Sequence, residues 1–91
     1  MTELTSLKNI GKTMDQKLKS VGISTAEELK AVGSKEVFAK LKRQYPGDKV
    51  MSLVHLYALE GAITDTEFNQ LPEDVKESLK HYNDGLKMFG I

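Results

Sequence analysis

The chain has 91 residues, of which 40% are hydrophobic and 29% are charged, and its formal net charge is zero. This size and composition predict one compact globular domain that spans residues 1–91. The sequence has no cysteine, which excludes disulfides and thiolate metal sites. It also has no apolar run of about 18 residues, as a membrane-spanning helix would need, and no signal-peptide pattern. We therefore expect a cytoplasmic protein with no membrane partner.

The neutral total hides an uneven distribution of charge. Residues 1–45 contain nine basic and five acidic side chains, which leaves +4, whereas residues 46–91 contain four basic and eight acidic side chains, which leaves −4. Association responds to local potential more than to net charge, so an anionic partner remains compatible with this composition. Mutual attraction of the two halves, or two solvated faces, would explain the split equally well.

A five-residue pattern, Leu-Lys-x-(Ile/Val)-Gly, occurs three times at intervals of 11 residues, at Leu7–Gly11, Leu18–Gly22 and Leu29–Gly33. The leucine and the β-branched residue share one helical face, and the glycine suits the left-handed position that ends a helix. One continuous helix could also have an 11-residue period, but each glycine would cost its interior about 1 kcal/mol. The repeat therefore predicts short helices separated by tight turns.

The starts of these helices are also indicated by the sequence. The first begins near Gly11, with the apolar stripe Ile10, Met14, Leu18 and Val21. A capping box, Thr25 with Glu28 or Ser24 with Glu27, starts the second, and Ser34 caps a third. The apolar positions of the third helix are Val37, Phe38, Leu41 and Tyr45. A turn at Tyr45–Asp48 ends it, and Asp48 can cap the next helix.

The most apolar segment, residues 49–64, predicts a central buried helix in which Gly61 marks the close approach of another helix. A single turn at Asp65–Gln70 is expected to place Phe68 in the core. Leu71–Asp74 then opens a last helix, with Pro72 at its first position. The inner stripe of that helix is Val75, Leu79, Tyr82 and Leu86. No strand pattern is found, so we expect an all-α bundle of about five short helices.

Catalytic chemistry is poorly supported. His55 lies among apolar residues on the helical wheel, which is typical of a core or rim histidine, and an enzymatic role would require it to be exposed beside acids in a pocket. Serine and threonine occupy caps and turns, and the sequence has neither a glycine-rich phosphate loop nor metal-ligand spacing. We therefore expect a non-enzyme with no metal and no cofactor.

The turn at Asn9–Thr13 is the candidate functional site. A tight turn that leads into a helix leaves amide groups unpaired at the positive end of that helix, and glycine lets a phosphate approach them. The candidate DNA-binding residues are Lys8, Asn9, Gly11, Lys12, Thr13 and Lys17. This proposal requires that the amides after Asn9 are not already hydrogen-bonded within the fold. All three glycines could instead serve only to terminate helices.

The Asn9–Thr13 stretch resembles the hairpin of helix-hairpin-helix modules, which implies that the N-terminal half binds the DNA backbone without reading its sequence. It also resembles the turn and helix with which the C-terminal domain of the RNA polymerase α-subunit approaches DNA. Asn9 replaces the usual first glycine of the hairpin. Asparagine tolerates left-handed geometry better than most residues, but its side chain could limit the approach of a phosphate.

From Leu4 to Leu79 the chain resembles the C-terminal domain of the TfoX/Sxy proteins. The resemblance rests on the three repeat copies, on Leu56–Ala62 and on Phe68–Pro72, and a tryptophan expected near Phe68 is absent. It implies a stand-alone, DNA-binding domain related to regulators of natural competence, without the N-terminal domain of longer members. The alternative is a protein-interaction module, such as a homodimer, that covers the apolar tail Met88–Ile91.

Overall fold

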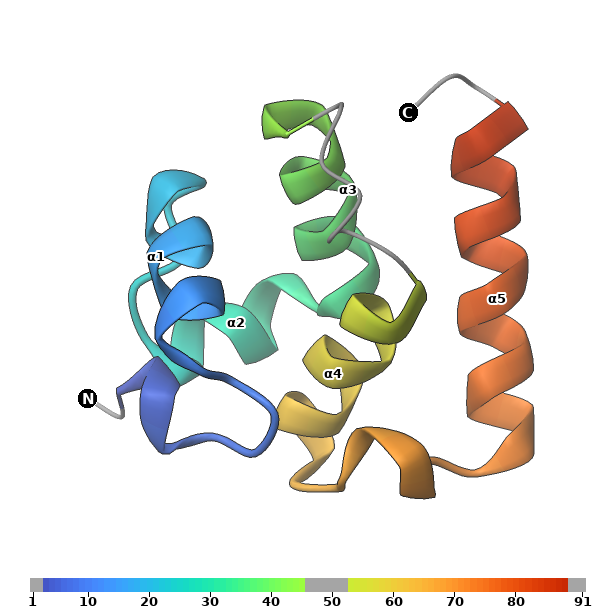
Figure 1. Ribbon diagram of the computed structural model, residues 1–91, viewed down its shortest axis with the longest axis horizontal. Coiled ribbons are helices and arrows are strands. Elements are labelled where there is room, and N and C mark those ends of the chain that lie inside the picture. Colours follow the sequence, from blue (N-terminus) through green and yellow to red (C-terminus); the bar gives the residue numbers. More distant parts are fainter. Residues whose placement is uncertain (1–2, 46–52, 89–91) are drawn as a thin grey trace.

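The computed structural model describes residues 3–45 and 53–88, which form five α-helices and two short 3-10 helices (Figure 1). In chain order they are η1 (Leu4–Ser6), α1 (Lys12–Ser20), α2 (Ala26–Val32), α3 (Ser34–Gln44), α4 (Leu53–Thr64), η2 (Phe68–Gln70) and α5 (Glu73–Met88). The described ranges contain no strand beyond an isolated bridge between Glu3 and Thr25. The predicted all-α bundle of about five helices is confirmed.

Helices α3 and α4 form the centre of the bundle. α3 packs on α1, α2, α4 and α5, and α4 packs on α2, α3, α5 and η2. Their facing side chains, Phe38, Leu41, Leu56 and Leu59, are fully buried. Helices α1 and α5 lie at opposite sides of the molecule (Figure 1). The start of α1 is therefore remote from the acidic first turn of α5.

The connection from α1 to α2 follows the pattern expected for a helix that ends at glycine. Gly22 has a φ of +87°, and the amide of Ile23 donates to the carbonyl of Leu18 at 2.9 Å. This hydrogen bond, together with the burial of both side chains, defines a Schellman motif. At the start of α2 the Thr25 hydroxyl accepts from the amide of Glu28 at 3.2 Å, which confirms Thr25 as the N-cap. The Glu28 carboxylate accepts from the amide of Ser24 at 3.2 Å instead of that of Thr25, so the reciprocal bond of the predicted capping box is shifted by one residue.

Gly33 both ends α2 and begins α3. Its φ of +93° lies in the left-handed region, its amide donates to Leu29 and its carbonyl accepts from Val37. The prediction that Ser34 caps α3 is wrong. Ser34 is the first helical residue, and its buried hydroxyl donates instead to the carboxylate of Glu60 on α4 at 2.6 Å.

Four other expectations also need correction. Unlike Leu18 and Leu29, Leu7 does not lie near the end of an α-helix, because only the 3-10 helix η1 precedes it. Gly11 is correspondingly extended, with a φ of −97°, and not left-handed. Phe68 is not in the core but 38% exposed. Gly61 is approached not by another helix but by the Thr66 carbonyl and the Asn9 amide. Pro72 precedes α5, and its carbonyl accepts from the amide of Lys76.

Several predicted features fall outside the described residues, namely the turn at Pro46–Asp48, the start of the central helix at residues 49–52 and the tail at residues 89–91. The described part of the central helix is buried at Leu56, Ala58, Leu59 and Ala62. Val54 is half exposed, so the predicted burial of this helix on all sides is wrong: one part of its apolar surface faces solvent.

Candidate functional site

The start of α1 is open to solvent. Gly11 is the N-cap, no side chain caps the helix, and Gly11, Lys12 and Thr13 are all exposed. The amide of Ile10 donates to the carbonyl of Leu7 at 3.4 Å, but no acceptor among the described residues pairs with the amides of Gly11, Lys12 and Thr13. Three unpaired amides at the positive end of a helix favour an anion at this point.

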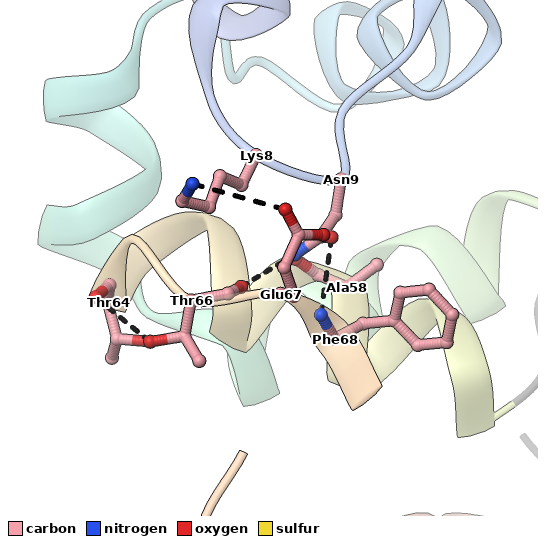
Figure 2. A network of polar contacts seen from close by, with 7 residues as sticks. All are labelled: Lys8, Asn9, Ala58, Thr64, Thr66, Glu67 and Phe68. Carbon is pink, nitrogen blue, oxygen red and sulfur yellow. Dashed lines mark hydrogen bonds and ion pairs between the residues drawn. The ribbon is translucent and has the colours of Figure 1, made fainter. Parts of the chain in front are cut away.

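Asn9 holds this turn against the distant α4–η2 junction, as Figure 2 shows. Its side-chain amide donates to the carbonyls of Thr66 at 3.0 Å and of Ala58 at 3.4 Å, and its oxygen accepts from the amide of Phe68 at 3.3 Å. Its own backbone is left-handed, with a φ of +70°. The Asn9 side chain is thus committed to the fold, and its role at the site is to position the turn.

A groove of about 540 Å³ lies beside the start of α1. One wall comes from the Asn9 turn and α1 and the other from α4 and η2. Its lining residues are Asn9, Gly11, Lys12, Thr13, Met14, Lys17, Val54, His55, Ala58 and Phe68. None of these residues carries an acid, so a negatively charged ligand would meet no carboxylate from the described part of the lining.

The lysines of the candidate site differ in their surroundings. Lys12 is exposed and makes no ion pair within the described residues. The ammonium of Lys17 lies 5.0 Å from the centroid of the Tyr45 ring, a cation–π distance. Lys8 does not line the groove, and its ammonium lies 3.9 Å from the Glu67 carboxylate (Figure 2). Both partners are about half exposed, so this pair contributes little stability.

A larger groove, about 640 Å³, lies between the α2–α3 junction and α5. Its polar groups pair with one another, since Lys35 donates to the Ser78 hydroxyl at 3.0 Å and Ser34 donates to Glu60. Burial, and then the charge of Glu36, raise the pKa of Tyr82 there, against the opposing effect of Arg43. This groove includes Glu36, Glu60 and Asp74 in its lining, which makes it a poor site for an anion.

The structure brings five of the six predicted residues together on one groove, and Lys8 stands apart. Sequence reasoning missed Val54, Ala58 and Phe68 as parts of the site. Their positions in the sequence gave no indication of a binding site, because apolar residues of this kind are equally expected in the core. His55 is half-buried and lines the groove.

The described helices and the turn at Gly11 define a small all-helical domain in which a hairpin-like turn presents the start of a helix to solvent. Within residues 3–45 and 53–88, no helix combines the length and the apolar character needed to cross a bilayer. In the same ranges, no three histidine, aspartate or glutamate side chains gather as metal ligands would.

The chain belongs to the TfoX C-terminal domain family, whose profile matches residues 1–82. It is similar to the crystal structure of an uncharacterized protein from Listeria monocytogenes in a triclinic form, with a TM-score of 0.88, 38% identity and 94% of each chain covered. It is also similar to a protein of unknown function from Listeria monocytogenes in a tetragonal form, with a TM-score of 0.84 and 39% identity over 90% of this chain and 98% of that chain. No curated protein matches it.

Proposed function

We propose that this domain is a non-catalytic DNA-binding module that contacts the phosphate backbone through the amides of Gly11, Lys12 and Thr13. The observation that carries the proposal is that these three amides are unpaired among the described residues, exposed and placed at the start of α1. Lys12 adds a positive charge at the same point. Such contacts are independent of base sequence, so binding should be weak and strongly dependent on salt.

The glycine at position 11 supports this proposal independently. Its φ of −97° is accessible to any residue, and a Cβ added there would meet no atom within 4 Å. Neither the backbone nor the packing of this domain therefore requires glycine. A phosphate that approaches the amides would be crowded by that Cβ, which gives the glycine a reason connected with binding.

The position of the site is also favourable. Helix α5, which begins with Glu73 and Asp74, lies on the other side of the molecule from α1 (Figure 1). The candidate site is therefore not covered by the acidic last helix, and two basic side chains, Lys12 and Lys17, line the groove beside it. A role in transcription or competence regulation in the cytoplasm, as a partner of DNA, is part of the same proposal and rests on the family alone.

The test is a titration of duplex DNA at about 50 mM salt and at higher salt. Lys12→Ala should reduce the slope of log affinity against log salt by about one and leave sequence preference unchanged. Gly11→Ala should weaken binding without loss of stability. The control for charge is Lys80→Ala, which removes an exposed lysine from α5, and it should bind as the parent does. No binding to duplex or to single-stranded DNA at about 50 mM salt would overturn the proposal.

A protein-interaction module is the second candidate function. It is favoured by Val54 and Phe68, which are 50% and 38% exposed beside the groove, and by Met88, which is 86% exposed. Contiguous apolar patches on a surface often mark a site that a partner covers, and Val54 and Phe68 line the same groove. Sedimentation measurements test it, because a homodimer is expected to dissociate on Phe68→Ala, whereas a strict monomer at all concentrations would contradict the homodimer.

A further inference from the structure

The groove beside α1 contains apolar residues in addition to the groups that could bind a phosphate. The amides of Gly11–Thr13 and the charge of Lys12 suffice to hold a phosphate at its edge. Apart from His55, the remaining lining is mainly apolar, from the buried Met14 and Ala58 and the exposed Phe68 and Val54. An aromatic ring left accessible beside a cationic edge is an arrangement that proteins use to stack a nucleobase.

The two walls of this groove are joined to each other. Asn9 directly precedes the turn that carries the amides, and its side-chain oxygen accepts from the amide of Phe68 itself at 3.3 Å. The same side chain donates to Ala58, another lining residue. The distance from the amides to the Phe68 wall is therefore set by the fold, so a ligand that spans both parts would meet a preformed site.

The positive charges along the groove favour a negatively charged ligand such as a nucleic acid. Lys12 and Lys17 lie on the α1 side, and no carboxylate is among the lining residues that the structure describes. A nucleotide combines the two groups that the groove distinguishes, namely an anionic phosphate and a flat, largely apolar base. In a duplex the bases are stacked and paired inside the helix, and only an unpaired base can enter such a groove.

We propose that the groove between α1 and the α4–η2 junction takes an unpaired base of a single strand, with an adjacent phosphate on the Gly11–Thr13 amides. This inference rests on the proposed function and names its substrate class as single-stranded DNA, or DNA with unpaired bases. The groove volume of about 540 Å³ has room for one base, and Phe68 provides the stacking surface. Lys12 and the amides contact the backbone, and the apolar wall contacts the base.

The experiment compares three labelled DNA probes by fluorescence anisotropy at about 50 mM salt. They are an oligothymidine of about 15 nucleotides, a duplex of the same length, and an abasic strand with the same number of phosphates. We expect the oligothymidine to bind about tenfold more tightly than either other probe, because stacking on an aromatic side chain gives about that preference per base. The abasic strand keeps the backbone charge and lacks the base, so it isolates the contribution of the groove.

Variants assign the effect to the groove. Phe68→Ala should reduce oligothymidine binding to the level of the abasic strand, and Phe68→Tyr should restore it. Lys12→Ala should weaken binding of all three probes by similar factors. The matched control is Val32→Ala, which removes an apolar side chain of the same 38% exposure from α2, outside this groove, and it should change nothing. Circular dichroism verifies that each variant is folded.

The outcomes separate this inference from the proposed function. Equal binding of the three probes, unaffected by Phe68→Ala but reduced by Lys12→Ala, would overturn the base-binding groove and leave backbone binding intact. Binding of none of the probes would overturn both. Self-association that depends on Phe68 and excludes the oligothymidine would assign the groove to a second copy of the chain, and would also overturn the inference.

Discussion

The turns after Leu7 and after Leu18 have the same sequence pattern but different backbones. After Leu18 the chain ends a helix locally, with Gly22 left-handed and the amide of Ile23 bonded to Leu18. After Leu7 the chain begins a helix, the left-handed residue is Asn9, and Gly11 is extended. Equal spacing of apolar residues thus indicates which side chains are buried, but not which backbone leads to them.

The two turns also differ in what holds them. The Gly22 turn is closed by hydrogen bonds between residues at most five apart, which the local sequence provides. The Asn9 turn is held by partners 49 to 59 positions away, at Ala58, Thr66 and Phe68. The second turn leaves the amides of Gly11, Lys12 and Thr13 without an acceptor among residues 3–45 and 53–88. The copy that depends on the tertiary structure is the one in which we propose the binding site.

The largest effect is expected where the Asn9 turn meets α4. A Cβ on Gly61 would collide with the Thr66 backbone carbonyl and with the Asn9 side-chain amide. Gly61→Ala should therefore lower the free energy of unfolding by about 3 kcal/mol, as overpacking against backbone does. Urea denaturation followed by circular dichroism measures this. Gly85→Ala on α5 is the control, since a Cβ there meets nothing within 4 Å, and it should not destabilise the domain.

The next effect separates the two roles of Asn9. Asn9→Gly keeps the left-handed backbone but removes the side-chain hydrogen bonds, and should cost about 1.5 kcal/mol of unfolding free energy. Asn9→Ala removes the same bonds and also places a Cβ at a φ of +70°, which should raise the cost to about 2.5 kcal/mol. Thermal and urea unfolding of both variants measures the difference. Equal stabilities of the two would mean that the backbone strain is negligible.

The smallest effect compares the two glycines that end the first two copies. Gly22→Ala should cost about 1 kcal/mol, because its φ of +87° strains any residue with a Cβ even though the surrounding space is open. Gly11→Ala should change stability by less than about 0.5 kcal/mol, because its backbone is extended. Unfolding curves recorded on both variants test this. A loss at position 11 as large as that at position 22 would contradict the comparison.

Much of the fold was predictable because its signals are local. Local signals account for the Thr25 N-cap of α2, the left-handed glycines at 22 and 33, and the burial of Leu18 and Leu29, because each follows from residues a few positions apart. The exposure of Phe68 was not predictable. An aromatic residue between two helices is usually buried, and only the packing of η2 beside α4 shows that it faces a groove.

The candidate site divides in the same way. The sequence by itself determined that the chain is all-helical and that a turn with lysines and a glycine leads into α1, because helix periodicity and turn chemistry depend on neighbouring residues. Only the tertiary structure decided that Asn9 faces inward to the α4–η2 junction, and that the turn shares a groove with Val54 and Phe68. Those contacts join residues more than 40 positions apart, and no local pattern records which distant carbonyl a side-chain amide will find.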